Sequence, residues 1–310
     1  MRVPPELLYH VTRQLFYYQR PPTLRGALYS RSEAIAKDAL LACSQVSHAM
    51  RQATLPFLFH TLAFSISLYK GLGYVGCTCR SSSLRDERAN CTAIAVYVRE
   101  VRVRMRCPDP ECSSEDVLND LEVEGEPLFA FFGSFPGLQV VYVESAFLYW
   151  GSLLRVEPIR PLAVESFSWN ADIPGIEHLP IETDIIDTLA AFSEVEHVEF
   201  RRMGFYDPEW QRWLGNRKRD RRPVRITSLR ISECKDAGDL LTYLHAVSAI
   251  QPNMLKSLFL SPVTERCLPS LSRFLGVFGT NLEQLELDIF ELDKFTAQCE
   301  YIIFASTAQL

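Results

Sequence analysis

The chain has 310 residues, of which 47% are apolar and 23% are charged, and this composition excludes an intrinsically disordered polypeptide. The length predicts about two domains. A formal net charge of -6 disfavours nucleic acid as the main partner. No run reaches the roughly 18 consecutive apolar residues of a membrane-spanning helix, so we expect neither a nucleic acid nor a membrane as partner.

The first helix is predicted at the amino terminus. Prolines suit the first turn of a helix, where a missing N–H is no loss, and large apolar residues then follow at helical spacing. These positions are Pro4, Pro5, Leu7, Leu8, Val11 and Leu15. We expect the helix to end near Pro21 and an insertion to occupy about residues 19–38.

A second stretch with helical spacing follows this insertion. Its apolar positions are Leu40, Leu41, Val46, Ala49, Met50 and Ala53, and Pro56 is expected to end it. The apolar faces of these short helices exceed what a module of some 60 residues can cover internally. Part of this surface is therefore expected to meet a partner.

Four segments within residues 1–60 carry a recognisable motif. They are Pro4-Pro5-Glu6-Leu7-Leu8, Leu40-Leu41, Val46-Ser47 with Met50-Arg51, and Leu58-Phe59. In order and spacing they resemble the F-box of fungal receptor proteins, although Val3 and Met50 stand where leucine and tryptophan are usual. The resemblance implies docking on a Skp-type adaptor, which links receptors to a cullin scaffold.

The residues that the resemblance assigns to adaptor binding are Pro4, Pro5, Leu7, Leu8, Val11, Leu40, Leu41, Val46 and Met50. The alternative interpretation is that residues 4–59 only cap the end of a repeat array.

Residues 61–97 predict a first strand followed by a flexible, glycine- and serine-rich insertion. Five cysteines lie in and just after it, at Cys77, Cys79, Cys91, Cys107 and Cys112. Their spacing does not match the paired spacing of structural zinc sites. We therefore predict no metal and no other cofactor.

Residues 98–310 repeat one pattern, apolar-x-x-apolar-x-apolar, at intervals of roughly 30 residues. The seven matches are Val98/Val101/Val103, Leu138/Val141/Val143, Val164/Phe167/Trp169, Val195/Val198/Phe200, Ile226/Leu229/Ile231, Leu255/Leu258/Leu260 and Leu282/Leu285/Leu287. Helix-like stretches lie between them at 184–192, 236–250 and 265–278. Alternating strands and helices predict an α/β fold with a parallel sheet.

This half of the chain resembles the divergent leucine-rich repeats of F-box receptors, which implies an irregular solenoid behind a short F-box-like helical module. In a solenoid, the strand positions that point away from the core line the surface that holds partners. Among these positions we select as candidate target-binding residues Arg102, Tyr142, Glu199, Arg230, Phe259 and Glu286, because arginine and aromatic side chains dominate interface energies.

Catalytic signatures are missing from the sequence: it has no nucleophile elbow, no His-Glu-x-x-His and no glycine-rich phosphate loop. The basic run at 217–222 fits a solvated loop, a nuclear-import signal or a patch for an acidic partner. Nine cysteines, an odd number, favour a reducing compartment, so we expect a cytoplasmic or nuclear protein. Residues 294–310 predict a helix without a polar capping repeat, which fits a chain that continues in a longer parent.

The sequence thus predicts a non-catalytic substrate receptor of a cullin-type ubiquitin ligase, which recruits an unidentified protein target through its repeats. One alternative is a repeat-based interaction module without ligase association. A second alternative is a metal-dependent binder of nucleic acid.

Overall fold

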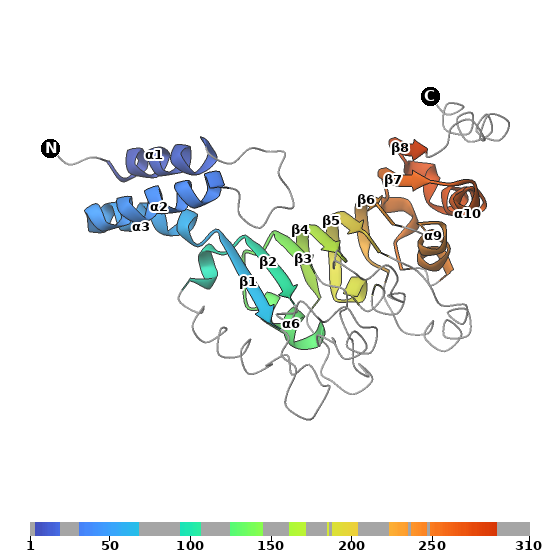
Figure 1. The fold of residues 1–310 in the computed structure, drawn as a ribbon, viewed down its shortest axis with the longest axis horizontal. Coiled ribbons are helices and arrows are strands. Elements are labelled where there is room, and N and C mark those ends of the chain that lie inside the picture. Colours follow the sequence, from blue (N-terminus) through green and yellow to red (C-terminus); the bar gives the residue numbers. More distant parts are fainter. Residues whose placement is uncertain are drawn as a thin grey trace.

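The structure, a computed structural model, describes residues 4–18, 31–67, 94–106, 125–144, 161–171, 185, 188–203, 223–234, 237–246 and 249–289. Within them, three helices precede a sheet of eight strands, and further helices lie between the later strands (Figure 1).

The helical module consists of α1 (Pro5–Tyr18), α2 (Arg31–Val46) and α3 (His48–Leu58). Ser47 separates α2 from α3 and caps α3, because its hydroxyl accepts a hydrogen bond of 3.2 Å from the Met50 N–H. The predicted stop near Pro21 lies outside the described residues.

Two boundaries of the module differ from the prediction. The helix α2 already begins at Arg31, so residues 31–38 are helical and the predicted insertion at 19–38 is too long. Residues 31–38 are mostly polar or charged, so their sequence shows no regular helical spacing of large apolar residues. Pro56 lies inside α3 and does not end it, because a proline near the end of a helix removes only one backbone hydrogen bond.

The helix α3 contacts both α1 and α2. The ring of Tyr9 lies 5.1 Å from that of Phe57, and the Thr12 hydroxyl lies 3.3 Å from the Ala53 carbonyl oxygen. Leu40 on α2 is buried as well. These contacts join the three helices into one packed unit.

The strands lie in the sheet in the same order as in the chain, β1 to β8, and all neighbouring strands are parallel. The strands are β1 (Thr61–Ser67), β2 (Glu100–Arg106), β3 (Val140–Glu144), β4 (Leu162–Asn170), β5 (Phe192–Arg201), β6 (Arg225–Ser232), β7 (Ser257–Val263) and β8 (Gln284–Ile289). The predicted α/β class with a parallel sheet is confirmed. The expected first strand is β1, and the seven sequence matches fall on β2 to β8.

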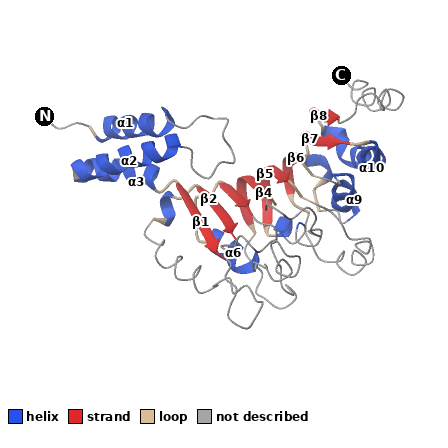
Figure 2. Ribbon diagram, in the orientation of Figure 1, coloured by secondary structure: helices blue, strands red, loops and turns tan. Residues whose placement is uncertain are grey.

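The longer described helices between strands are α6 (Gly125–Phe132), α9 (Ala237–Ala246) and α10 (Leu268–Phe278), and the short 3-10 helix η4 (Glu265–Cys267) precedes α10. Figure 2 shows them along one side of the strands. The prediction for 265–278 is confirmed, and α9 is shorter than the predicted 236–250. The predicted helix at 184–192 extends too far, because Phe192 already starts β5. The helix α6 was not predicted.

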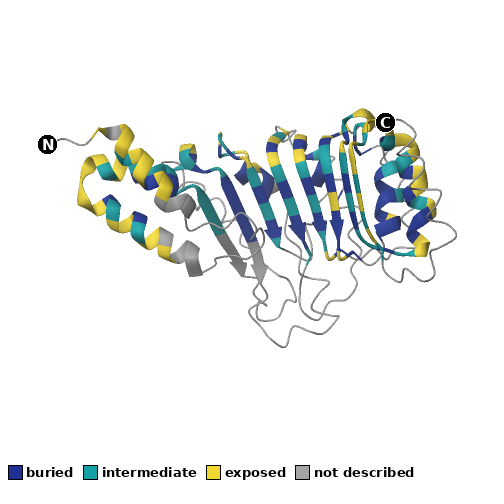
Figure 3. Cartoon of the chain, turned by 90° about the horizontal axis from the view of Figure 1, so that it is seen from above, coloured by how far each residue is buried: buried dark blue, intermediate teal, exposed yellow. Residues whose placement is uncertain are grey.

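The core lies between these helices and one face of the sheet. Two rows of inward side chains cross the strands, and from β2 to β7 none is more than 1% exposed: Val101, Val141, Phe167, Val198, Leu229 and Leu258 in one row, Val103, Val143, Trp169, Phe200, Ile231 and Leu260 in the other. Figure 3 shows the resulting alternation of buried and less buried positions along the strands. Each such side chain contributes about 1.5–3 kcal/mol by leaving water.

Candidate protein-binding surfaces

The strand register brings the predicted target-binding residues into one row across the sheet. Successive Cα partners in this row are Arg102, Tyr142, Ser168, Glu199, Arg230, Phe259 and Glu286. We call it the outer row, because side chains alternate along a strand and these positions point away from the buried rows. All six predicted residues belong to it, and Ser168 is the additional member on β4.

The β2 end of the outer row is closed. Arg102 is only 8% exposed, and its Nε donates a hydrogen bond of 2.6 Å to the Glu100 carboxylate. The Thr61 hydroxyl donates to the same carboxylate over 3.1 Å. The prediction that Arg102 is open to a target is therefore wrong: its charge is matched by a glutamate two positions earlier on the same strand face.

Tyr142, the next member, is half-buried, and its hydroxyl accepts a hydrogen bond of 3.3 Å from the Asn170 side-chain amide. This contact fixes the ring against β4. Tyr142 thus offers a target part of its ring and a hydroxyl that already has one partner.

The β6–β8 end of the outer row is open. The Arg230 guanidinium carbon lies 3.6 Å from the centroid of the Phe259 ring, a cation–π contact between adjacent strands. Half of the Arg230 side chain remains exposed, and its Nε lies 3.6 Å from a Glu199 carboxylate oxygen. Glu286, the last member, is exposed.

Hydroxyl groups surround this open end. Ser228 on β6 and Ser257 on β7 are register partners. They precede Arg230 and Phe259 by two residues, so they lie on the same face of the sheet, and both are half-buried. On the other side of the row, the Ser261 hydroxyl donates to the Asp288 carboxylate over 2.7 Å. The open end therefore combines an arginine, an aromatic ring and small polar groups.

Sequence reasoning missed an ion-pair cluster at the ends of β5 and β6. The Glu233 carboxylate accepts hydrogen bonds from the side chains of Arg201 and Arg202, the first over 2.9 Å from Nε. Desolvation acts to raise the pKa of Glu233, but the hydrogen bonds and charges of the two arginines outweigh it and hold this pKa below the ordinary value of a glutamate. Both Arg202 and Glu233 have φ near 56°. Glycine and asparagine are the residues that usually adopt this geometry, and neither stands at these positions, so the sequence did not predict it.

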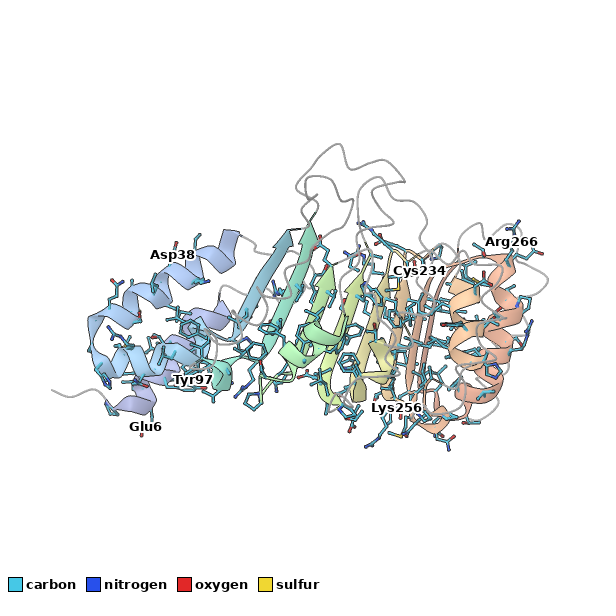
Figure 4. All side chains as sticks on the ribbon, turned by 90° about the horizontal axis from the view of Figure 1, so that it is seen from below. Glu6, Asp38, Tyr97, Cys234, Lys256 and Arg266 are labelled. Carbon is cyan, nitrogen blue, oxygen red and sulfur yellow. The ribbon has the colours of Figure 1, made fainter. Side chains whose placement is uncertain are left out.

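The helical module also leaves large apolar side chains exposed. Leu7 is 54% exposed, Val11 47%, Leu41 50% and Val46 75%. Charged residues such as Glu6 and Asp38 lie on the same helices (Figure 4). Two further exposed residues that the prediction did not include are Tyr9 and Ile35.

The other predicted adaptor-binding residues are less uniform. Pro4 is exposed, whereas Leu8 and Met50 are half-buried, and the Pro5 side chain lies outside the described part. Leu40 is 1% exposed and packs inside the module. The prediction that Leu40 contacts an adaptor is therefore wrong. Helical spacing identified Leu40 as one of the apolar positions of the module, but it could not show that this side chain points into the module.

Among the described residues, no group of three or more His, Cys, Asp or Glu side chains could hold a metal ion. The Cys77–Cys112 cluster and the basic run at 217–222 lie outside the described residues. Cys234, just after β6 (Figure 4), is a free, buried thiol, and burial raises its pKa to about 12. It therefore stays protonated and is a poor nucleophile. In the described ranges, no helix has both the length and the apolar character needed to cross a membrane.

Comparison with known proteins gives no relative: no protein-family model matches the chain, and no curated protein sequence matches it either. The proposal below therefore rests on the motifs of the sequence and on the exposed residues described above.

Proposed function

We propose that this chain is a substrate-receptor subunit of a cullin-type ubiquitin ligase. In this proposal α1 to α3 form an F-box-like module that docks on a Skp-type adaptor. The strands and helices after them form a divergent leucine-rich-repeat-like solenoid, whose outer row holds a protein target.

The observation that carries the proposal is the set of large apolar side chains that the helical module leaves exposed. Leu7, Val11, Leu41 and Val46 remain about half or more exposed although the module already has packed contacts of its own. Burying one such side chain in an interface is worth about 1.5–3 kcal/mol before the costs of association. This surface supports docking, because a mere cap would direct its large apolar residues toward the chain that it covers.

The strand order supports the second half of the proposal. Strand after strand is added on the same side of its predecessor, with one face packed against helices and the other carrying the outer row. A sheet of this kind leaves a long surface for a partner, as repeat proteins do.

The mechanism in this proposal is proximity. The helical module fixes the chain to the ligase, the outer row holds a target, and a conjugating enzyme elsewhere in the assembly transfers ubiquitin to target lysines. The chain contributes a raised local concentration and supplies no reacting group.

The test is co-purification of the full, affinity-tagged chain with a Skp-type adaptor and a cullin. We expect the unaltered chain to retain both proteins. The double variant Leu7→Glu with Leu41→Glu should lose both, because two buried carboxylates would be left unpaired in the interface. The matched control is Val277→Glu, which changes an exposed apolar residue on α10 and should retain both.

Absence of both proteins from the unaltered pull-down would contradict the proposal. The alternative is then a repeat-based interaction module without ligase association. One observation favours it: Leu40, which belongs to the F-box-like motif, is sealed inside the module.

A further inference from the structure

We propose that Arg230 is the anchor of the target-binding surface and that it binds the carboxylate side chain of an aspartate or glutamate in the partner protein. This inference rests on the proposed function, because it names the chemistry of the target that the outer row holds. Three features of the open end carry it.

The first feature is the fixed position of the guanidinium. It lies 3.6 Å from the centroid of the Phe259 ring, on a side chain that is half exposed. Stacking on an aromatic ring restricts a side chain that otherwise loses much rotamer freedom on binding. A ligand therefore meets an arginine that is already oriented.

The second feature is a set of unused donors. A guanidinium has five N–H groups, and those of Arg230 make no hydrogen bond to any residue that the structure describes. Arg230 forms an ion pair with Glu199, but the carboxylate oxygen lies 3.6 Å from Nε, which is beyond normal hydrogen-bond length. A planar carboxylate can accept two parallel hydrogen bonds from such a fork.

The third feature is the pair of hydroxyls beside the arginine. Within the described ranges, the side chains of Ser228 and Ser257 have no hydrogen-bond partner, and both lie on the face of Arg230, two residues earlier in the register. Each can donate a further hydrogen bond to a bound anion. The site thus offers one cation and two neutral donors.

The charge around the site favours a carboxylate over a phosphate. Glu199 and Glu286 occupy the outer row on either side of the Arg230–Phe259 pair. The cost of desolvating an anion grows with the square of its charge, whereas its attraction to one guanidinium grows only linearly. A single arginine flanked by carboxylates therefore binds a dianionic phosphate poorly.

The experiment probes the full chain with an array of short peptides that each carry one glutamate among apolar residues. Each peptide is present in matched forms with glutamate, glutamine or phosphoserine at that position. For the retained peptides, the dissociation constant is measured in solution by fluorescence anisotropy. We expect glutamate→glutamine to weaken binding by about tenfold or more, the loss expected for a charge-assisted hydrogen-bonded pair.

Variants of the chain complete the test. Arg230→Gln should weaken binding of the glutamate peptides by about the same factor and have little further effect on the glutamine peptides. Arg230→Lys should also weaken binding, because lysine keeps the charge but lacks the fork. The matched control is Arg225→Gln, an exposed arginine on the same strand that pairs with Glu194 and should leave affinity unchanged.

The inference is overturned if no retained peptide depends on its glutamate, if Arg230→Gln binds as the unaltered chain does, or if phosphoserine peptides bind more tightly than glutamate peptides through Arg230. Circular dichroism and thermal unfolding verify that each variant is folded. Failure here is separable from failure of the proposed function, because adaptor co-purification depends on the helical module and should be unchanged in Arg230→Gln.

Discussion

Glu233 links the ends of β5 and β6, and two separate bends, one at Arg202 and one at Glu233, have positive φ. A left-handed backbone costs about 1–2 kcal/mol for a residue other than glycine. The paired arginines stabilise the carboxylate form and so favour the bend at Glu233. Because the folded pKa is lowered, the contribution to stability is present above the unfolded pKa and is lost as pH falls through the folded pKa.

We therefore predict that Glu233→Gln lowers the melting temperature near neutral pH and that the difference from the unaltered chain shrinks as the pH falls below about 4. Thermal unfolding over a pH series measures this. The control is Glu286→Gln, which removes an exposed carboxylate without an arginine partner among the described residues. A difference that is constant from pH 7 to acid would contradict the assignment.

Single residues of the outer row show what the sequence could reveal. The period of two on each strand was enough to place all six predicted residues on one face. It could not show that Arg102 is buried beside Glu100 or that Arg230 stacks on Phe259. These contacts depend on packing between segments that are distant in the chain.

Two helical glycines with opposite surroundings give a prediction at the level of elements. A Cβ on Gly238, in the first turn of α9, would lie 3.0 Å from the Cys267 Cα atom in η4, whereas a Cβ on Gly276 in α10 would meet nothing within 4 Å. We expect Gly276→Ala to stabilise the fold by about 0.5–1 kcal/mol through helix propensity. Gly238→Ala should destabilise it, because backbone must move.

Denaturant unfolding of both variants measures the two effects. Gly276→Ala serves as the reference for helix propensity alone, so the contrast between the variants reports the close approach of α9 to η4. Equal stabilisation by both substitutions would show that this approach leaves room for a methyl group.

Among the elements, predictability followed the strength of the periodic signal. The stretch at 265–278 has most of its apolar residues at helical spacing on one side and was predicted with its observed bounds. The helix α6, Gly125–Phe132, was missed because it is short and ends in a nearly continuous apolar run, which has no period to detect. The turn geometry after each strand was not predictable either.

At the level of the whole molecule, each strand pairs only with its neighbours in the chain. We predict that Leu258→Ala in β7 costs about 2–5 kcal/mol locally and lowers hydrogen-exchange protection in β6 to β8, with little change in β2 and β3. Leu258 is fully buried. The control Ser257→Ala, on the outer face of the same strand, should leave protection nearly unchanged.

Amide exchange resolved by strand, followed by mass spectrometry, tests this expectation. A uniform loss of protection from β2 to β8 would mean that the sheet opens as one cooperative unit, contrary to the prediction.

The consecutive strand order also bears on how the protein is made. A ribosome releases the polypeptide from its amino terminus, so each new strand emerges when the strand beside it has already been synthesised. Of the eight strands that the structure describes, none has to wait for a distant partner still to be translated. The sheet can therefore grow at the pace of synthesis, with a single growing edge that moves along with the nascent chain.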